Sequence, residues 1–426
     1  MSRAIALAAA LLTVASAAAQ TAPPLSLRDA ETRALQNHPQ ILAGQYTAQA
    51  GTETTREARS AYFPTVYGNV TGADAQDGSR IAAGGLNNPI ILDRVAAGVS
   101  VSQLVTDFGR TSNLVQTVSL RAQALQQSAV TDRADVLLRV DRAYFGALRA
   151  QAILRVAADT VAARQLVTDQ VSALAQSNLK SGLDLSFARV NLSEAQLLLL
   201  QARNDQAAAF ATLAAALGQA DAPAYELSEE PQPAAPPTDD AAVVAQALRE
   251  RPDVAGERLA RESAAKFADA ERALWFPTIS AIGAAGLAPL RQTGLNPNYS
   301  AIGINVSVPL SNGNLFAARH TEASLHARAE GERLRDLENR VTRDVRLALL
   351  DAQSGFQRLD LTNQLLDQAS QAQELAEARY GLGLSSIVEL TQAQLNKTRA
   401  EIEQASARYD YQARMAALRY QTGSLK

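Results

Sequence analysis

Apolar positions along the chain recur with two different periods, and each period predicts a different kind of element. Segments rich in Ala, Leu, Gln, Arg and Glu, which are good helix formers, run without proline between Pro89 and Pro223 and again after Pro309. Residues 108–179 contain no strong break, which predicts a helix on the order of 100 Å long at ~1.5 Å per residue. A helix of that length needs a partner along its whole length. Apolar residues near the C-terminus recur every seven positions and favour left-handed coiled packing against such a partner. These residues are Val388, Leu395, Ile402, Tyr409 and Ala416.

Four short segments between the helices instead alternate at every second residue, which is the pattern of a β-strand. They cover residues 64–72, 95–102, 278–287 and 299–308, and loops at 74–92 and 288–298 join them in pairs. Strands of about ten residues suit a transmembrane β-barrel, in which ~9–11 tilted residues cross the membrane.

Aromatic residues stand at the ends of these strands, as in the interfacial girdle of a membrane barrel. They are Tyr62, Phe63, Trp275, Phe276 and Tyr299. Four strands cannot close a barrel alone, and an open strand edge cannot face lipid. Strands that span a membrane would therefore belong to a barrel shared by several chains. The alternative is a small soluble β-domain.

The chain is built twice. Tyr62-Phe-Pro-Thr resembles Trp275-Phe-Pro-Thr, 213 residues later, and Gly218 corresponds to Gly423, 205 residues later. Each copy reads as helix, strand, loop, strand, very long helix, hairpin, helix. We expect a first structural repeat at 20–218, a proline-rich linker or equatorial segment at 219–240, and a second repeat at 241–426.

The first residues have the pattern of a secretory signal. Arg3 precedes an apolar run, which small residues follow, and we expect a signal peptide at 1–19. The run is too short for a membrane-spanning helix, which needs ~20 apolar residues.

Composition excludes several kinds of chemistry. The chain has no cysteine, which excludes disulfides, thiolate metal sites, thiol catalysis and a lipid anchor on cysteine. Its net charge of -3 gives no electrostatic support for a nucleic-acid partner. The three histidines are scattered, and no nucleophile–base pair or phosphate-binding loop stands out. We therefore expect no enzyme, no cofactor and no metal site.

A tight turn in each repeat connects two helices into a hairpin. In the second repeat Tyr380 and Gly383 end one helix and Ser386 starts the next, and residues 179–189 form a fainter version of the same turn.

The turns also contain carboxylates at the helix starts. Ser386 and Glu389 have the spacing of a capping box, and Ser181 and Asp184 repeat it. Carboxylates suit helix starts electrostatically, so the residues themselves assign Glu389 a capping role.

The duplication, the aromatic-Phe-Pro-Thr motifs and the hairpins together resemble the TolC family of outer-membrane efflux proteins. Residues 380–393 are similar to that family's second hairpin, and residues 183–189 to its first. The resemblance implies a mainly α fold with a small β part. Three chains would share one 12-stranded transmembrane β-barrel, with four strands per chain, continued by a long coiled α-helical barrel.

The resemblance also implies a function. The homotrimer would be the exit duct of a tripartite efflux pump or a type I secretion system, in the outer membrane of a Gram-negative bacterium and extending into the periplasm. Its partners would be a periplasmic adaptor (membrane fusion) protein and an inner-membrane RND or ABC transporter. The alternative is a soluble periplasmic coiled-coil adaptor or scaffold, which would not need the four strands.

Five residues would form the pore constriction and gate by the same resemblance. Glu389 would point into the closed pore, where three copies would form a carboxylate ring that favours cations. The Tyr380 hydroxyl would link neighbouring coils, with Asp184 as a helper. Ser385 stands where the family has a basic residue, and Gln392 where it often has a second acid.

Overall fold

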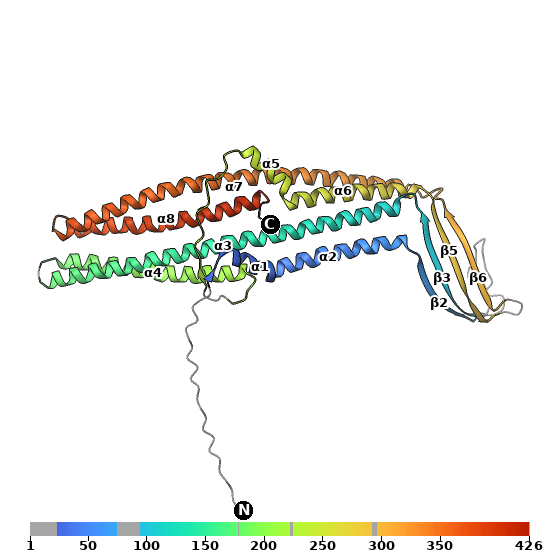
Figure 1. The fold of residues 1–426 in the computed structure, drawn as a ribbon, viewed down its shortest axis with the longest axis horizontal. Coiled ribbons are helices and arrows are strands. Elements are labelled where there is room, and N and C mark those ends of the chain that lie inside the picture. Colours follow the sequence, from blue (N-terminus) through green and yellow to red (C-terminus); the bar gives the residue numbers. More distant parts are fainter. Residues whose placement is uncertain (1–23, 75–93, 178, 222–224, 292–295, 426) are drawn as a thin grey trace, which may run out of the picture. The chain divides into compact units, whose positions relative to one another are not determined.

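The computed structural model is dominated by helices, with one four-stranded sheet beside them (Figure 1). The predicted mainly α fold with a small β part is therefore confirmed. The described residues are 24–74, 94–177, 179–221, 225–291 and 296–425. The predicted signal peptide, nearly all of the loop predicted at 74–92 and residues 292–295 lie outside them. The loop predicted at 288–298 is shorter than expected, because strands continue to Leu290 and begin again at Asn298. No helix within the described ranges is both long enough and apolar enough to cross a bilayer.

The α-helices form two series of four. The first series is α1 (Leu27–Asn37), α2 (Pro39–Arg59), α3 (Arg110–Gln176) and α4 (Gly182–Ala216). The second is α5 (Asp240–Glu250), α6 (Pro252–Arg272), α7 (Leu315–Gly381) and α8 (Ile387–Gln421). Corresponding helices have equal lengths of 11, 21, 67 and 35 residues. The break-free segment at 108–179 thus holds a single helix, α3.

Matching residues set the first helix boundaries in both series. The side chains of Ser26 and Asp239 each accept a backbone N–H from the first turn of the following helix, α1 and α5. Pro39 and Pro252 then begin α2 and α6, because proline cannot continue the preceding helix but fits a first turn. Single-turn 3-10 helices, η1 (Ser60–Tyr62) and η2 (Ala273–Trp275), follow and lead into the strands.

The four predicted strands form one antiparallel sheet with the order β2-β3-β5-β6. They are β2 (Thr65–Ala73), β3 (Arg94–Thr106), β5 (Thr278–Leu290) and β6 (Asn298–Ser307). The central pairing of β3 with β5 joins the first half of the chain to the second. In the described chain β2 and β6 are the edge strands.

One face of the sheet is apolar. Residues directly opposite each other in neighbouring strands share a face. Val66 lies opposite Val101, Val101 opposite Gly283, and Gly283 opposite Ile302. The Ile302 side chain is 93% exposed. The alternation in the sequence thus places β-branched residues together on a face that the chain itself leaves uncovered.

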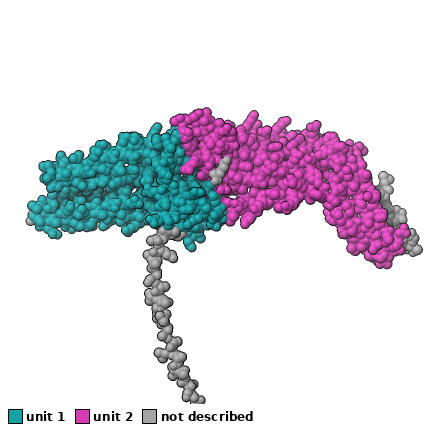
Figure 2. All heavy atoms as spheres, viewed as in Figure 1, with its two compact units in different colours: residues 1–38, 137–236, 352–416 teal, residues 39–136, 237–351, 417–426 magenta. Residues whose placement is uncertain are grey.

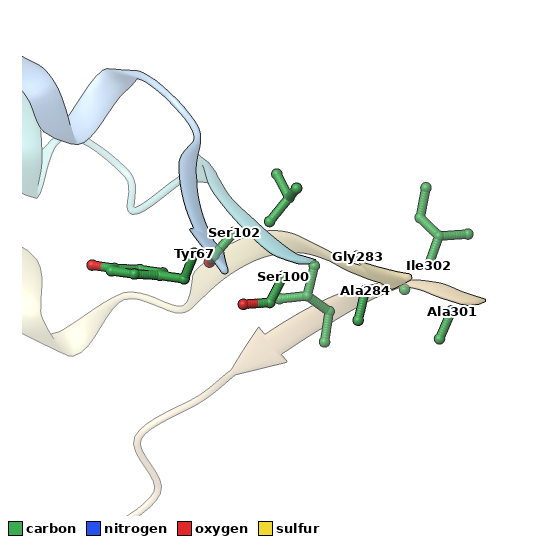
Figure 3. Close-up of a pocket in the computed structure, with 10 residues that line it drawn as sticks. Tyr67, Ser100, Ser102, Gly283, Ala284, Ala301 and Ile302 are labelled. Carbon is green, nitrogen blue, oxygen red and sulfur yellow. The ribbon is translucent and has the colours of Figure 1, made fainter. Parts of the chain in front are cut away.

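The opposite face carries small and polar residues. The register places Tyr67 opposite Ser100, Ser100 opposite Ala284, and Ala284 opposite Ala301. Figure 3 shows Ser100, Ala284 and Ala301 pointing away from the side on which Ile302 lies. These residues help to line a hollow of about 400 Å³ on the sheet.

A second, very short sheet had no signal in the sequence pattern. In it β1 (Pro24–Leu25) pairs in parallel with β4 (Glu226–Leu227). The buried Tyr144 hydroxyl lies 2.8 Å from the Leu25 carbonyl oxygen and 2.7 Å from that of Ser228. One α3 side chain therefore holds the N-terminal segment and the linker together.

The rest of the linker is fastened to α8. The Tyr411 hydroxyl donates to the Ala234 carbonyl oxygen at 2.6 Å, and the Gln412 amide donates to that of Glu230 at 3.1 Å. Both α8 side chains are fully buried. The segment expected to be a linker therefore runs over α3 and α8 with defined contacts.

The chain divides into two compact units, which Figure 2 colours separately. Unit 1 comprises residues 1–38, 137–236 and 352–416, and it contains both hairpin turns and the short parallel sheet. Unit 2 comprises residues 39–136, 237–351 and 417–426, and it contains the four-stranded sheet. Each unit takes segments from both halves of the sequence.

The seven-residue repeat in α8 is only partly buried. Tyr409 and Ala416 are buried, but Val388 is 56% exposed. At that end Ile387 and Leu390 are buried instead. The buried stripe near the turn thus begins one position before the stripe that the sequence predicted.

Candidate functional site at the paired hairpins

The second hairpin turn, residues 382–386, has the hydrogen bonds of a glycine-terminated helix. The Leu384 N–H donates to the Arg379 carbonyl oxygen at 2.8 Å, and the Gly383 N–H donates to that of Tyr380 at 3.1 Å. Gly383 has a φ of +72°, a left-handed conformation that glycine adopts without a steric penalty. The turn is therefore defined by its backbone, as the glycines predicted.

Only half of the predicted capping box forms in this turn. The Glu389 N–H donates to the Ser386 hydroxyl at 3.3 Å. The Glu389 carboxylate instead faces the end of α7, where Oε1 lies 3.1 Å from Nε of Arg379. Arg379 also donates from Nη2 to the Leu384 carbonyl oxygen at 3.4 Å. The guanidinium therefore links the turn backbone to the carboxylate.

The first hairpin behaves differently. Asp184 N–H donates to the Ser181 hydroxyl at 3.1 Å, and Ser181 N–H donates to the Asp184 carboxylate at 3.3 Å. This is a complete capping box. The two equivalent carboxylates thus have different partners, the helix start for Asp184 and an arginine for Glu389.

The two hairpins meet at Tyr380. Nζ of Lys180, in the first turn, lies 4.1 Å from the centre of the Tyr380 ring. The Tyr380 hydroxyl is buried and has no hydrogen-bond partner among the described residues. Burial, and then the negative charge of Asp184, raise the pKa of Tyr380 above its usual value. The contact between the hairpins therefore runs through the ring rather than through a hydrogen bond of the hydroxyl.

Ser385 and Gln392 form no hydrogen bond between the hairpins within the described part of the chain. The Ser385 hydroxyl is buried without a hydrogen-bond partner among the described residues. The Gln392 amide is exposed and donates to Asn396, one turn further along α8, at 2.9 Å.

An apolar cluster packs the hairpins together below the turns. Its buried members come from all four long helices, and they are Val171, Ala188, Ala376, Ile387 and Leu390. Polar contacts continue the junction between the hairpins. Asn191 donates to the Thr391 hydroxyl at 2.9 Å, and the buried Arg164 donates to the Gln394 side chain. Burial lowers the pKa of Arg164.

The turns themselves expose apolar side chains. Those at least 56% exposed are Leu179, Leu183, Leu382, Leu384 and Val388. Both hairpins contribute to this exposed surface, which we call the tip surface and define by these five residues.

Comparison with known proteins identifies the family. The model of the family described as "Outer membrane efflux protein" matches residues 32–219 and 243–424. The chain belongs to this family.

Relatives of the efflux-protein family extend the match over nearly the whole chain. The outer membrane protein TolC of Vibrio cholerae is 24% identical over 407 residues, covering 94% of this chain and 91% of its own. The crystal structure of a membrane protein from Pseudomonas aeruginosa matches with a TM-score of 0.81 at 20% identity, covering 93% of both chains. The Campylobacter jejuni CmeC outer membrane channel matches with a TM-score of 0.77 at 16% identity, covering 93% of this chain and 85% of its own.

Membership confirms the expected class of protein and its location. The efflux proteins are channels of the Gram-negative outer membrane and not enzymes, so this chain is an outer-membrane efflux channel protein. The exposed apolar face of its sheet agrees with that location.

The structure places four of the predicted girdle aromatics where the helices enter the strands. Trp275 packs edge-on against Phe316 with ring centres 5.8 Å apart, and Phe276 lies 5.9 Å from Phe108. Tyr62 and Phe63 precede β2 and are exposed. Their girdle role stays a prediction.

Tyr299 has a different position. It lies opposite Gly286 on the small-residue face, and a β-carbon at Gly286 or Gly98 would collide with its side chain. Its side chain therefore lies over two glycines on the face opposite the apolar one.

Sequence reasoning missed the two basic partners of the site, Arg379 and Lys180. A signal for Lys180 existed, because the 205-residue offset between the hairpins aligns Lys180 with Ser385. The basic residue absent from the second turn is present at the equivalent position of the first.

Proposed function

We propose that three copies of this chain form one channel. Their twelve strands would close a β-barrel in the outer membrane, and their long helices would form a tunnel through the periplasm. The channel would be the outer-membrane exit of a tripartite efflux pump or of a type I secretion system.

The main support for this proposal comes from the four-stranded sheet. Its apolar face is exposed, and β2 and β6 have no partner on their outer edges in the described chain. In lipid, each backbone N–H and C=O group must be paired, because no water is there to replace a partner. Pairing β2 of one copy with β6 of the next would satisfy both edges and close the barrel.

The tip surface supports a docking role for the hairpin end. Five exposed apolar residues gather at the two turns. An apolar surface on a periplasmic tunnel fits contact with another protein. We assign this contact to the periplasmic adaptor, which would connect the channel to an inner-membrane RND or ABC transporter.

The hairpin junction is the proposed gate. Tyr380 holds the two hairpins of one chain together through Lys180, and Asp184 and Ser181 stiffen the first turn. Glu389 would face the constriction, with Ser386 capping the helix behind it. Gln392, one turn further, would add no charge to the pore.

Cysteine cross-linking tests the assembly. The sequence has no cysteine, so any disulfide that forms must join the introduced cysteines. Asn69→Cys on β2 would be combined in turn with Ala301→Cys and Gly303→Cys on β6. We expect oxidised dimers and trimers on denaturing gels of outer membranes.

The matched control is the pair Ser100→Cys and Ala284→Cys, which face each other within one chain. It should oxidise without raising the molecular mass. Exclusively monomeric protein in mild detergent, with no cross-linking of any edge pair, would reject the shared barrel. A soluble, membrane-free trimer would favour the periplasmic scaffold instead.

A further inference from the structure

We infer that Arg379 cancels the charge of Glu389 at the channel constriction, so that the closed channel discriminates little between cations and anions. This rests on the proposed function, in which copies of Glu389 surround the pore. A ring of three lone carboxylates would instead favour cations.

The geometry places the two charges in direct contact. Arg379 lies in the last turn of α7 and Glu389 in the first turn of α8, and their nearest atoms are 3.1 Å apart. The guanidinium is held from a second side by the Leu384 carbonyl oxygen. Arg379 is thus part of the same turn, and each protomer brings its own counter-charge.

The caps explain why Glu389 is available for this contact. In the first hairpin the Asp184 carboxylate accepts the Ser181 N–H and completes the capping box. In the second hairpin Ser386 supplies the cap through its hydroxyl alone, and the Glu389 carboxylate turns to Arg379.

Charges of the two turns balance as a whole. Residues 177–189 and 377–392 together include three basic and three acidic residues. They are Lys180, Arg189, Arg379, Asp184, Glu377 and Glu389. The charges in these two stretches therefore sum to zero.

The contact does not need to be strong to have this effect. The side chains of Arg379 and Glu389 are 54% and 46% exposed, and exposed pairs add little to folding stability. A passing ion, however, responds to the sum of both charges, because their nearest atoms are only 3.1 Å apart.

Planar bilayer measurements under a salt gradient test the inference on the full-length channel. For the unaltered protein we expect a reversal potential near zero. Arg379→Gln should raise the permeability of cations relative to anions by at least about fivefold, because one uncompensated charge at ~4 Å gives that factor in water and all three copies lose their counter-charge. Glu389→Gln should shift the ratio the opposite way, and the double variant should return it to near the original value.

Arg335→Gln is the matched control, because Arg335 is also an exposed α7 arginine, paired with Glu332 and remote from the turn. It should leave the reversal potential unchanged. A cation-selective unaltered channel that Arg379→Gln does not change would overturn the inference while leaving the channel proposal intact. A preparation that forms no pores at all would count against the proposed function instead.

Discussion

The ammonium of Lys180 lies 4.1 Å from the centre of the Tyr380 ring, so the first hairpin holds the second through a cation–π contact. The Tyr380 hydroxyl, in contrast, is buried without a partner among the described residues. The ring and the ammonium, rather than the hydroxyl, join the hairpins of one chain.

Substitutions at this contact should separate the ring from the hydroxyl. Tyr380→Leu and Lys180→Gln each remove the cation–π contact, worth ~0.5–2 kcal/mol per chain, and should raise the resting conductance of single channels in a planar bilayer. Tyr380→Phe keeps the ring and should change the resting conductance little. A Tyr380→Phe channel as leaky as Tyr380→Leu would show that the hydroxyl makes the link, for example with a neighbouring copy.

The two helix caps should respond differently to loss of their carboxylates. Asp184→Ala removes the carboxylate that accepts the Ser181 N–H and should cost ~1 kcal/mol of local stability. Glu389→Ala removes no hydrogen bond of its cap, and both variants keep the serine hydroxyl as the acceptor of the helix-start N–H. Amide hydrogen exchange should therefore accelerate at residues 182–186 in the first variant, and less at 387–391 in the second. Ser181→Ala and Ser386→Ala serve as matched controls, and both should accelerate exchange. Equal acceleration in the two acidic variants would contradict the difference between the caps.

Close packing on the sheet should make one glycine sensitive to substitution by alanine, whereas another glycine should tolerate it. A β-carbon at Gly98 would collide with Tyr299 and with the Ala285 carbonyl oxygen, so Gly98→Ala should destabilise the sheet by ~1–3 kcal/mol. Gly68→Ala is the control, because a β-carbon there meets nothing within 4 Å. The temperature at which the assembled protein dissociates, followed on gels, measures the effect of both substitutions. A loss of similar size in the two variants would argue against the Tyr299 contact.

Alkaline pH should weaken unit 1 through Tyr144. Burial is the main cause that raises its pKa far above the usual value near 10. The unfolded chain ionises this hydroxyl above pH ~10 while the folded chain does not, so stability is complete below that pH and falls as pH rises above it. Denaturant unfolding at pH 9 and 11 should show a smaller loss for Tyr144→Phe than for the unaltered protein. Tyr46→Phe, at an exposed position, should not alter that loss.

The long helices and the strands could be predicted because their signals are local and repeated. Proline-free segments and good helix formers indicated α3 and α7, and period-two alternation indicated the strands around Val66 and Ile302. The turn at Gly383 was also predictable, since a left-handed position favours glycine.

The contacts between hairpins could not be predicted in the same way. Lys180 and Tyr380 are 200 residues apart, and nothing in a single periodic pattern brings them together. Arg379 and Glu389 are only ten residues apart, but which partner the carboxylate chooses depends on the path of the turn backbone. The short strands β1 and β4 have two residues each, too few to show any period.

The pairing of β1 with β4 has a consequence for the order in which the chain can fold. In a chain exported from its N-terminus, Leu25 emerges early, but its strand partner Leu227 follows only about two hundred residues later. The linker in turn can bond to α8 only after Tyr411 has emerged. Unit 1 therefore cannot be completed until nearly all of the chain has been delivered. A truncated export product would remain open at this point and exposed to periplasmic proteases, which would keep incomplete chains out of the assembled channel.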